Sequence, residues 1–306
     1  MLALAFLLLA ALAPSKTYDA VYVATLSDIP PGLQSLDVWI PLPKSSEHQK
    51  VSDVRIESPY KWTRRTEPVW GNVYAYARIP KPQPGVLTTK VAFTVTRSEA
   101  QFAMLHAGHG KPPATTLRPN RLVTLSPRMH ELADTVTAGK SGTLSQARAI
   151  YDHLLATMTY DKTTPGWGMG DSERACDVRK GNCTDFHSLF MSLARAKGIP
   201  SRFVIGFPLT ANDGVAKGYH CWAEFWLDGK GWVPVDASDA SKSSDPKVRD
   251  YLFGNLDTAR VQFTTGRDLE LQPATSEPLN YFVYPRGEAG GNVTGVPSIA
   301  LEFHPR

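Results

Sequence analysis

The spacing of apolar residues changes twice along the chain, and this change limits the fold more than any other feature of the sequence. Over residues 17–116, apolar and polar residues alternate in short runs such as 35–40 and 90–95, which indicates β-strands. From Ser126 the apolar residues recur every three or four positions, as in amphipathic helices, and from residue 201 the alternation returns. Strands, then helices, then strands predict an α+β protein with antiparallel sheets.

The sequence divides into three folded segments. Residues 17–116 carry proline pairs between their expected strands, which suits an N-terminal antiparallel β-sandwich because proline is tolerated at strand edges and turns. Residues 117–250 should form a core of helices packed on an antiparallel sheet. Residues 251–306 contain further expected strands, including the run 281–284, and are too few for a core of their own. We therefore expect them to form a short β extension that completes or flanks the core.

Two helix starts carry local signals. Ser126 and Pro127 fit the N-cap and the first position of a helix. Thr143 and Gln146 fit a capping box that would start a second helix.

The first 13 residues, MLALAFLLLAALA, form an apolar run that is shorter than the roughly 20 residues of a membrane-spanning helix. Its length and the small residues Ala11 and Ala13 are typical of a signal peptide and its cleavage site. We assign residues 1–16 to this signal. The mature protein should then be exported, periplasmic or secreted, and should have no membrane span.

Composition argues against several partners and cofactors. The net charge is +4 and the charged residues are spread along the chain, so we expect no nucleic-acid partner. The three cysteines, Cys176, Cys183 and Cys221, lack the paired spacing of a structural zinc site, and no calcium-loop motif occurs. We expect no metal and no cofactor. Either all three cysteines are reduced, or Cys176 and Cys221 form a disulfide that leaves Cys183 free.

Cys183 precedes a helical apolar pattern directly, within the segment 181–185 (GNCTD). We therefore expect it in the first turn of a helix, where free N–H groups and the helix dipole stabilise an anion. A thiol in that position can ionise and act as a nucleophile. The alternative is a buried structural cysteine, because free cysteine is often buried.

Two residues later in the sequence, His220 and Asp236, could supply the remaining groups of a thiol catalyst. His220 opens a strand of otherwise apolar residues, and Asp236 ends the strand expected to pair with it. A nucleophile, a base and a carboxylate that orients the base are the groups that thiol catalysis uses. A His220–Asp236 pair that is only structural remains the alternative, since a buried histidine needs a polar partner in any case.

These segments resemble the transglutaminase-like superfamily, which has a papain-like thiol core. The matching sequences are GNCTDFHSLFMSLARAKGIPSRFVIGF at 181–207 and GYHCWAEFWLDGKGWVPVDAS at 218–238, within a resemblance that covers about 126–238. The resemblance implies Cys183 as nucleophile, His220 as base and then acid, and Asp236 as the group that holds the imidazole. It also implies attack on a peptide or protein amide, with a thioester that an amine or water resolves.

An oxyanion hole would combine the backbone N–H of Cys183 with one upstream side-chain donor, for which Tyr160 and Trp167 are the candidates. His187 lies one turn after Cys183 and could contact the site, but we expect it to be a polar helix residue beside a partly open cleft. Cys221 should point away from the face of His220, because neighbouring side chains alternate along a strand, and should take no part in catalysis.

The hairpin turn Asp228-Gly229-Lys230-Gly231 decides whether Asp236 can reach His220. A two- or four-residue loop would place Asp236 opposite Ala223 and on the wrong face of the sheet. A three- or five-residue loop, or a bulge at a glycine, would place it on the face of His220. We predict one of the latter arrangements.

Three functions fit these observations. The first is a transglutaminase-like thiol enzyme that attacks a peptide or protein amide. The second is a cysteine peptidase or amidase that hydrolyses peptide or cell-wall substrates, because transfer and hydrolysis differ only in what reaches the thioester. The third is a non-catalytic protein-binding module that retains the fold.

Overall fold

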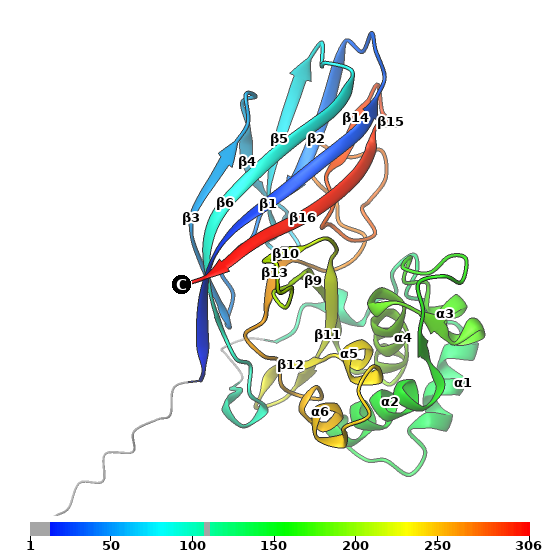
Figure 1. The fold of residues 1–306 in the computed structure, drawn as a ribbon. Helices are drawn as coiled ribbons and strands as arrows, with labels where there is room; N and C mark the ends of the chain where they lie inside the picture. The colour runs from blue at the N-terminus through cyan, green and yellow to red at the C-terminus, as the bar shows by residue number, and fades with distance from the viewer. Residues whose placement is uncertain (1–12, 107–110) are drawn as a thin grey trace, which may run out of the picture.

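The computed structural model describes residues 13–106 and 111–306, which form a β-sandwich and a helical core that meet along one side (Figure 1). Most of the expected signal peptide, residues 1–12, lies outside the described residues, as does part of the glycine- and proline-rich stretch at 107–113. The first strand begins at Ser15, so the folded chain starts inside the segment that we assigned to the signal. Cleavage after Ala13 would leave that strand whole.

The sandwich consists of two five-stranded antiparallel sheets, as the alternating pattern predicts. In order, the first sheet contains β10 (Val215–Ala216), β16 (Val296–Pro305), β1 (Ser15–Ile29), β6 (Gly85–Ser98) and β3 (Gln49–Glu57). The second contains β15 (Asn292–Val293), β14 (Arg286–Ala289), β2 (Ser35–Pro41), β5 (Val73–Pro80) and β4 (Thr63–Thr66).

Strand β1 illustrates why these residues form a sandwich. Tyr18, Ala20, Tyr22, Ala24 and Leu26 are all buried, whereas the residues between them are partly or fully exposed. This period of two places one face of the strand in the core and the other toward solvent.

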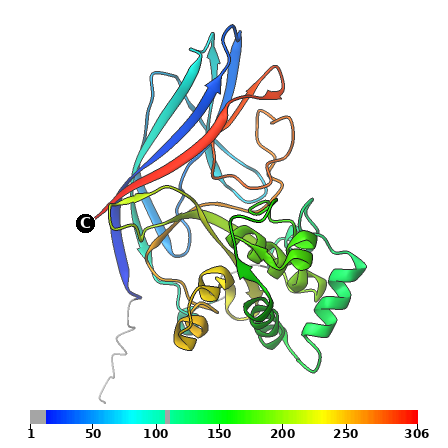
Figure 2. The same cartoon turned by 45° about the vertical axis from the view of Figure 1, so that its right-hand side comes forward.

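The C-terminal segment divides between the two parts of the molecule. We expected residues 251–306 to complete or flank the core, and β13 (Arg260–Thr265) does join the core sheet. The later strands do not, because β14 pairs with β2, and β16 pairs with β1 over ten residue pairs (Figure 2). The chain therefore returns to the sandwich that it started. Sequence alone does not indicate this return, because pairing between distant strands leaves no local signal.

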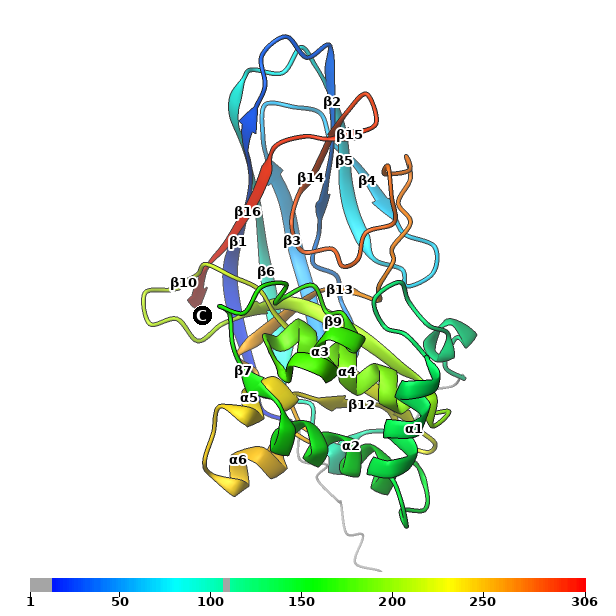
Figure 3. The ribbon, with the colours of Figure 1, turned by 90° about the vertical axis from the view of Figure 1, so that its right-hand side faces the viewer.

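The core contains a four-stranded antiparallel sheet and the helices that cover it. The sheet runs in the order β12 (Gly231–Val235), β11 (His220–Leu227), β9 (Ser201–Pro208) and β13. The helices are α1 (Pro127–Val136), α2 (Thr143–Thr157), α3 (Ser172–Val178), α4 (Cys183–Ala196), α5 (Ala237–Ser241) and α6 (Pro246–Tyr251). The short elements are the 3₁₀ turns η1 (Phe102–Met104) and η2 (Ala114–Leu117) and the parallel pair β7 (Thr159–Tyr160) and β8 (Lys180–Gly181). Helix α4 packs on β9 and β11 (Figure 3).

The predicted helix starts are correct in one case and displaced in the other. Ser126 caps α1 by accepting from the N–H of Met129, and Pro127 is the first helical residue, as expected. Helix α2 already begins at Thr143, so Gly142 is its N-cap and the capping box is absent. Gly142 has φ +80°, a conformation that glycine adopts without strain, so the chain enters the helix one residue earlier than the polar pattern suggests.

Aromatic side chains connect the sandwich to the core. The ring of Tyr22 on β1 lies 5.1 Å from that of Phe263 on β13 and 5.7 Å from that of Phe207 on β9. Its hydroxyl donates to the carbonyl of Val283 at 2.9 Å. The two parts therefore share one continuous hydrophobic core.

The run 281–284 is not the strand that its composition predicts. Its backbone is irregular, and two of its carbonyls accept hydrogen bonds from side chains rather than from a partner strand. Thr264 Oγ1 donates to the carbonyl of Phe282, and the Tyr22 hydroxyl donates to that of Val283. Phe282 and Val283 are buried, whereas Tyr281 and Tyr284 line a cleft beside Cys183.

Candidate active site

Cys183 is the first residue of α4, as the sequence predicts. Asn182 is the N-cap, and its side chain accepts from the N–H of Thr184 at 2.9 Å. Asp185 completes a capping box by accepting from the N–H of Asn182 at 2.9 Å. This cap fixes the start of the helix, so that the Cys183 side chain and N–H lie at the positive end of the helix dipole.

Asp185 also organises the loop before the helix. Its carboxylate accepts from the N–H of Gly168 at 2.7 Å and from that of Gly170 at 3.0 Å. A Cβ at Gly181 would collide with the Asp185 side chain, so glycine is required at that position. One buried carboxylate therefore ties the 168–170 loop to the first turn of α4. This role of Asp185 was not predicted, although an Asn at the N-cap with an acid three positions later is a recognisable signal.

The Cys183 side chain is buried and its environment favours the thiolate. Burial opposes ionisation, but hydrogen bonds from Cys221 and His220 and the positive charge of His220 hold the pKa of the Cys183 thiol well below its usual range. A thiolate at neutral pH is the nucleophilic form of cysteine.

His220 is the first residue of β11 and contacts both Cys183 and Asp236. Its Nε2 lies 2.7 Å from Asp236 Oδ2, so the ring nitrogen left for Cys183 is Nδ1. Burial lowers the pKa of His220, but the carboxylates of Asp236 and Asp239 outweigh burial and raise that pKa to about 10. The arrangement therefore favours an ion pair of imidazolium and thiolate.

The hairpin between β11 and β12 has the loop that this contact requires. Leu227 pairs with Gly231, so the loop consists of three residues, and Ala223 pairs with Val235. Asp236, one residue beyond β12, therefore lies on the same face as His220, and the predicted odd-length loop is confirmed. Gly229 and Gly231 have φ +79° and +81°, the left-handed conformation that a short loop of this kind needs.

Asp236 is fully buried and both of its carboxylate oxygens are engaged. Oδ1 accepts from the N–H of Asp239 at 3.0 Å and from Ser238 Oγ at 3.1 Å, which caps α5. Oδ2 accepts from Arg260 Nη1 at 2.7 Å in addition to its contact with His220. Burial opposes the charge, but His220 and Arg260 hold the pKa of Asp236 well below its usual range. Asp236 thus remains a carboxylate beside the imidazole.

His187 and Cys221 occupy places that the sequence did not predict. We expected His187 beside an open cleft, but it is fully buried and its Nε2 lies 3.6 Å from Asp236 Oδ1. We expected Cys221 to point away from the site, yet its Sγ lies 3.7 Å from His187 Nδ1 and contacts Cys183. The reason is that α4 packs against β11, so its first turns approach adjacent side chains of the strand. The side chains of His187 and Cys221 therefore both lie next to the Cys183 thiol, on its buried side.

The three cysteines are free thiols in the structure, which agrees with the reduced alternative. Cys176 lies on α3, partly exposed, and lines a separate surface hollow with Arg128 and His153. It takes no part in the arrangement around Cys183.

A cleft of about 490 Å³ opens above Cys183. The lining residues come from four segments and include both predicted oxyanion donors: Tyr160, Lys162, Trp167, Gly168, Met169, Asn182, Cys183, Lys217, Gly218, Tyr219, Asn280, Tyr281 and Tyr284. Contacts between segments hold the walls: Tyr281 Oη donates to the carbonyl of Gly168 at 3.2 Å, and Asn280 Nδ2 to that of Met169 at 2.8 Å.

Tyr160 and Trp167 lie in the same cleft as Cys183 but differ in exposure. Tyr160 is partly buried and packs against Phe186, whereas Trp167 is 39% exposed at the rim. The structure adds Tyr219, whose hydroxyl accepts from Asn182 Nδ2 at 2.9 Å and lies 2.9 Å from Thr184 Oγ1. Tyr219 therefore holds the residues on either side of Cys183.

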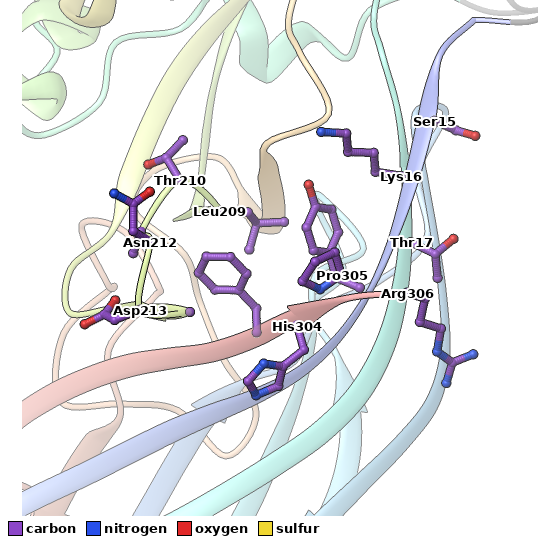
Figure 4. Close-up of a pocket in the computed structure, with 14 residues that line it drawn as sticks. Ser15, Lys16, Thr17, Leu209, Thr210, Asn212, Asp213, His304, Pro305 and Arg306 are labelled. Atoms are coloured by element: carbon purple, nitrogen blue, oxygen red, sulfur yellow. The ribbon is translucent and has the colours of Figure 1, made fainter.

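A larger cavity of about 940 Å³ lies elsewhere, between the start of β1, the end of β16 and the loop after β9 (Figure 4). The described side chains that line it include no cysteine, and Arg306 there pairs with Asp19 at 2.7 Å. The loop residues Leu209 to Gly214 line this cavity, and the same connection continues to Lys217 and Tyr219 of the cleft.

The ligand atoms of His220, Asp236 and Asp239 lie within 4.8 Å of one another, a separation that a metal ion could bridge. The guanidinium of Arg260 already contacts the Asp236 carboxylate in this group. A cation at that position would face a fixed positive charge, so the donor set does not fit a metal.

Residues 130–237 match the family described as the transglutaminase-like superfamily. An uncharacterised protein of Haemophilus influenzae is 30% identical over 323 residues, which cover 91% of this chain and 85% of that protein.

One solved structure shares the fold over nearly the whole chain. A candidate cysteine protease from Cytophaga hutchinsonii superposes with a TM-score of 0.68 at 15% identity, covering 96% of this chain and 91% of that one. The periplasmic domain of TgpA from Pseudomonas aeruginosa matches 74% of this chain and 89% of its own with a TM-score of 0.38 at 18% identity. The first superposition covers the sandwich as well as the core, so the two-part architecture is shared.

Proposed function

This chain belongs to the transglutaminase-like superfamily, and on that premise we propose that it is a thiol enzyme that attacks a peptide or protein amide through Cys183, His220 and Asp236. The observation that carries the proposal is the contact of His220 with both Asp236 and Cys183 at the first turn of α4, beneath an open cleft. If the His220–Asp236 pair were only structural, there would be no functional reason for the lowered pKa of the neighbouring Cys183 thiol.

The reaction begins with the ion pair. The Cys183 thiolate attacks the amide carbonyl carbon, a C–S bond forms, and the carbonyl π electrons move to oxygen. The N–H of Cys183 and a side-chain donor from Tyr160 or Trp167 would stabilise the oxyanion. As the oxyanion collapses, the C–N bond breaks and His220 gives its proton to the leaving nitrogen, which departs as ammonia or an amine. A thioester on Cys183 remains.

The second half reverses these roles. Neutral His220 takes a proton from water or from an amine as that nucleophile attacks the thioester carbonyl. The C–S bond then breaks, the acyl group leaves, and the thiolate–imidazolium pair is restored. Asp236, held by Arg260 and by the cap of α5, keeps the imidazole in place throughout.

Hydrolysis is the second candidate outcome, which would make the protein a cysteine peptidase or amidase. The exposed rim of the cleft favours it, because Trp167 and Met169 are 39% and 53% exposed and leave a route for water to the thioester.

One experiment separates the outcomes. The protein is incubated with a glutamine-containing peptide, with and without a tagged primary amine, and the products are weighed by mass spectrometry. Addition of the amine indicates transfer, a one-unit gain indicates deamidation, and shorter peptides indicate cleavage. Cys183→Ala is the control and should abolish every product. Binding of the peptide without any product from the wild type would instead favour a non-catalytic binding module.

Export is part of this proposal. Among residues 13–106 and 111–306, no helix is both long enough and apolar enough to cross a membrane. The N-terminal sequence of the protein isolated from its native host checks the predicted cleavage after Ala13.

A further inference from the structure

We propose that the cleft above Cys183 selects peptides that carry a carboxylate within one or two residues of the amide under attack. This inference rests on the proposed function and names the substrate class of the same site. It follows from two lysine side chains in the lining of the cleft, which includes no described aspartate or glutamate.

Two lysines carry the positive charge. Lys162 follows β7 and Lys217 precedes β11, so they come from separate segments, and both are exposed residues of the cleft lining. Neither makes an ion pair with any acid in the described part of the chain. The Lys162 ammonium lies 5.9 Å from the centre of the Tyr160 ring, which places it against the cleft wall.

No described residue that lines the cleft is acidic. The nearby carboxylates have partners of their own. Asp185 accepts from three backbone N–H groups, Asp161 accepts from the N–H groups of Thr163 and Thr164, and Asp239 pairs with Lys242 at 2.7 Å. Within residues 13–106 and 111–306 the two lysines therefore have no acidic partner, and a bound anion would supply one.

The remaining walls suit a peptide rather than a small ion. Tyr160, Trp167, Tyr281 and Tyr284 offer aromatic surface along the cleft, and Met169 extends it at the rim. Aromatic walls pack against apolar side chains, while an ammonium attracts a carboxylate at the same time. The carboxylate has two sources, an acidic side chain or the C-terminus of the substrate.

Three glutamine peptides of one sequence test the proposal on the full-length protein. The first is neutral with an amidated C-terminus, the second has glutamate next to the glutamine, and the third has a free C-terminal carboxylate. We expect at least one acidic peptide to react with a kcat/KM about fivefold above the neutral peptide, the range of one exposed ion pair. The advantage should shrink at 0.5 M salt, because exposed charges are screened at about that ionic strength.

The matched variants are Lys162→Gln with Lys217→Gln, and Lys247→Gln as a control on the exposed helix α6. The double variant should lose the preference for the acidic peptide, and the control should keep it. A preference that survives in the double variant, or a wild type that prefers the neutral peptide, overturns the proposal.

The proposed function can fail separately. If no peptide is turned over, the chemistry assigned to Cys183 is wrong, but calorimetric binding of the same three peptides to Cys183→Ala still tests the lysines. Tighter binding of an acidic peptide that disappears in the Cys183→Ala variant carrying both lysine substitutions supports the proposal. Equal binding of all three peptides refutes it.

Discussion

Arg260 and Asp236 form a buried ion pair in which Nη1 of the guanidinium lies 2.7 Å from Oδ2 of the carboxylate. Arg260 comes from β13, beyond residues 130–237 that match the family. Asp257 holds the other side of the guanidinium at 3.3 Å. The strand that returns the chain toward the sandwich thus also supplies the counterion for the carboxylate that holds His220.

The first prediction separates the structural and chemical roles of this ion pair. Asp236→Asn should lower kcat about 10⁴-fold, because His220 loses the carboxylate that orients and charges it. It should also destabilise the protein by about 3–5 kcal/mol, since Arg260 is left buried beside a neutral group.

The double variant Asp236→Asn with Arg260→Met is the control for that prediction. It removes both charges and should recover part of the free energy of unfolding in urea while kcat stays low. Recovery of activity along with stability would show that Asp236 is only a structural partner.

The second prediction concerns alkylation. Cys183 should react with iodoacetamide near pH 6 at least about tenfold faster than Cys176 or Cys221, because its environment favours the thiolate at a pH where an ordinary thiol is protonated. Burial raises the pKa of both other thiols. Peptide mapping after timed labelling from pH 5 to 9 measures the three rates. Similar rates for Cys183 and Cys176 at pH 6 would contradict a depressed pKa.

The third prediction follows from linkage between that pKa and stability. In the folded protein the pKa of Cys183 lies below the value of about 8.5 that an unfolded chain has, so its contribution to stability is complete above that pH. The contribution is lost as pH falls through the folded pKa. The free energy of unfolding of the wild type, minus that of Cys183→Ala, should therefore grow from pH 5 to pH 8.5. Urea unfolding at each pH gives the difference, and a constant difference would refute the ionised thiol.

The pKa of His220 acts in the opposite direction. It is raised to about 10, so the stability that its charge contributes is complete below the unfolded value of about 6.5 and is lost as pH rises toward 10. The wild type should lose stability between pH 8.5 and 10. His220→Gln should show a smaller loss in the same urea titration, and an equal loss would assign the effect to other groups.

The fourth prediction tests Asp185, the buried carboxylate two residues after Cys183. Asp185→Asn should reduce stability by about 1–3 kcal/mol, because one amide oxygen replaces two carboxylate oxygens that satisfy three N–H groups. It should also lower kcat/KM, since the loop that carries Trp167 forms one wall of the cleft. Asp177→Asn, an exposed change on α3, is the control and should leave both quantities unchanged. Full activity of Asp185→Asn would show that the 168–170 loop takes no part in substrate binding.

The local sequence determined the positions of helices and strands and the types of side chain at the candidate site. Alternation in β1 and helical spacing after Cys183 depend on which residues face the core, and that information lies within each segment. The odd-length turn at 228–230 could be predicted because side chains alternate along a strand. Only an odd loop length, or a bulge, places Asp236 on the same face of the sheet as His220.

Tertiary structure decided what meets at the thiol. Pairing of β16 with β1, the burial of His187 beside Asp236 and the contact between Arg260 and Asp236 join residues that are far apart in the chain. Such contacts depend on how sheets and helices pack in three dimensions, and no periodic pattern within one segment encodes them. The sequence alone therefore indicated a cysteine, a histidine and an aspartate for the site, whereas packing specified the arginine that keeps the aspartate charged and the lysines that line the cleft.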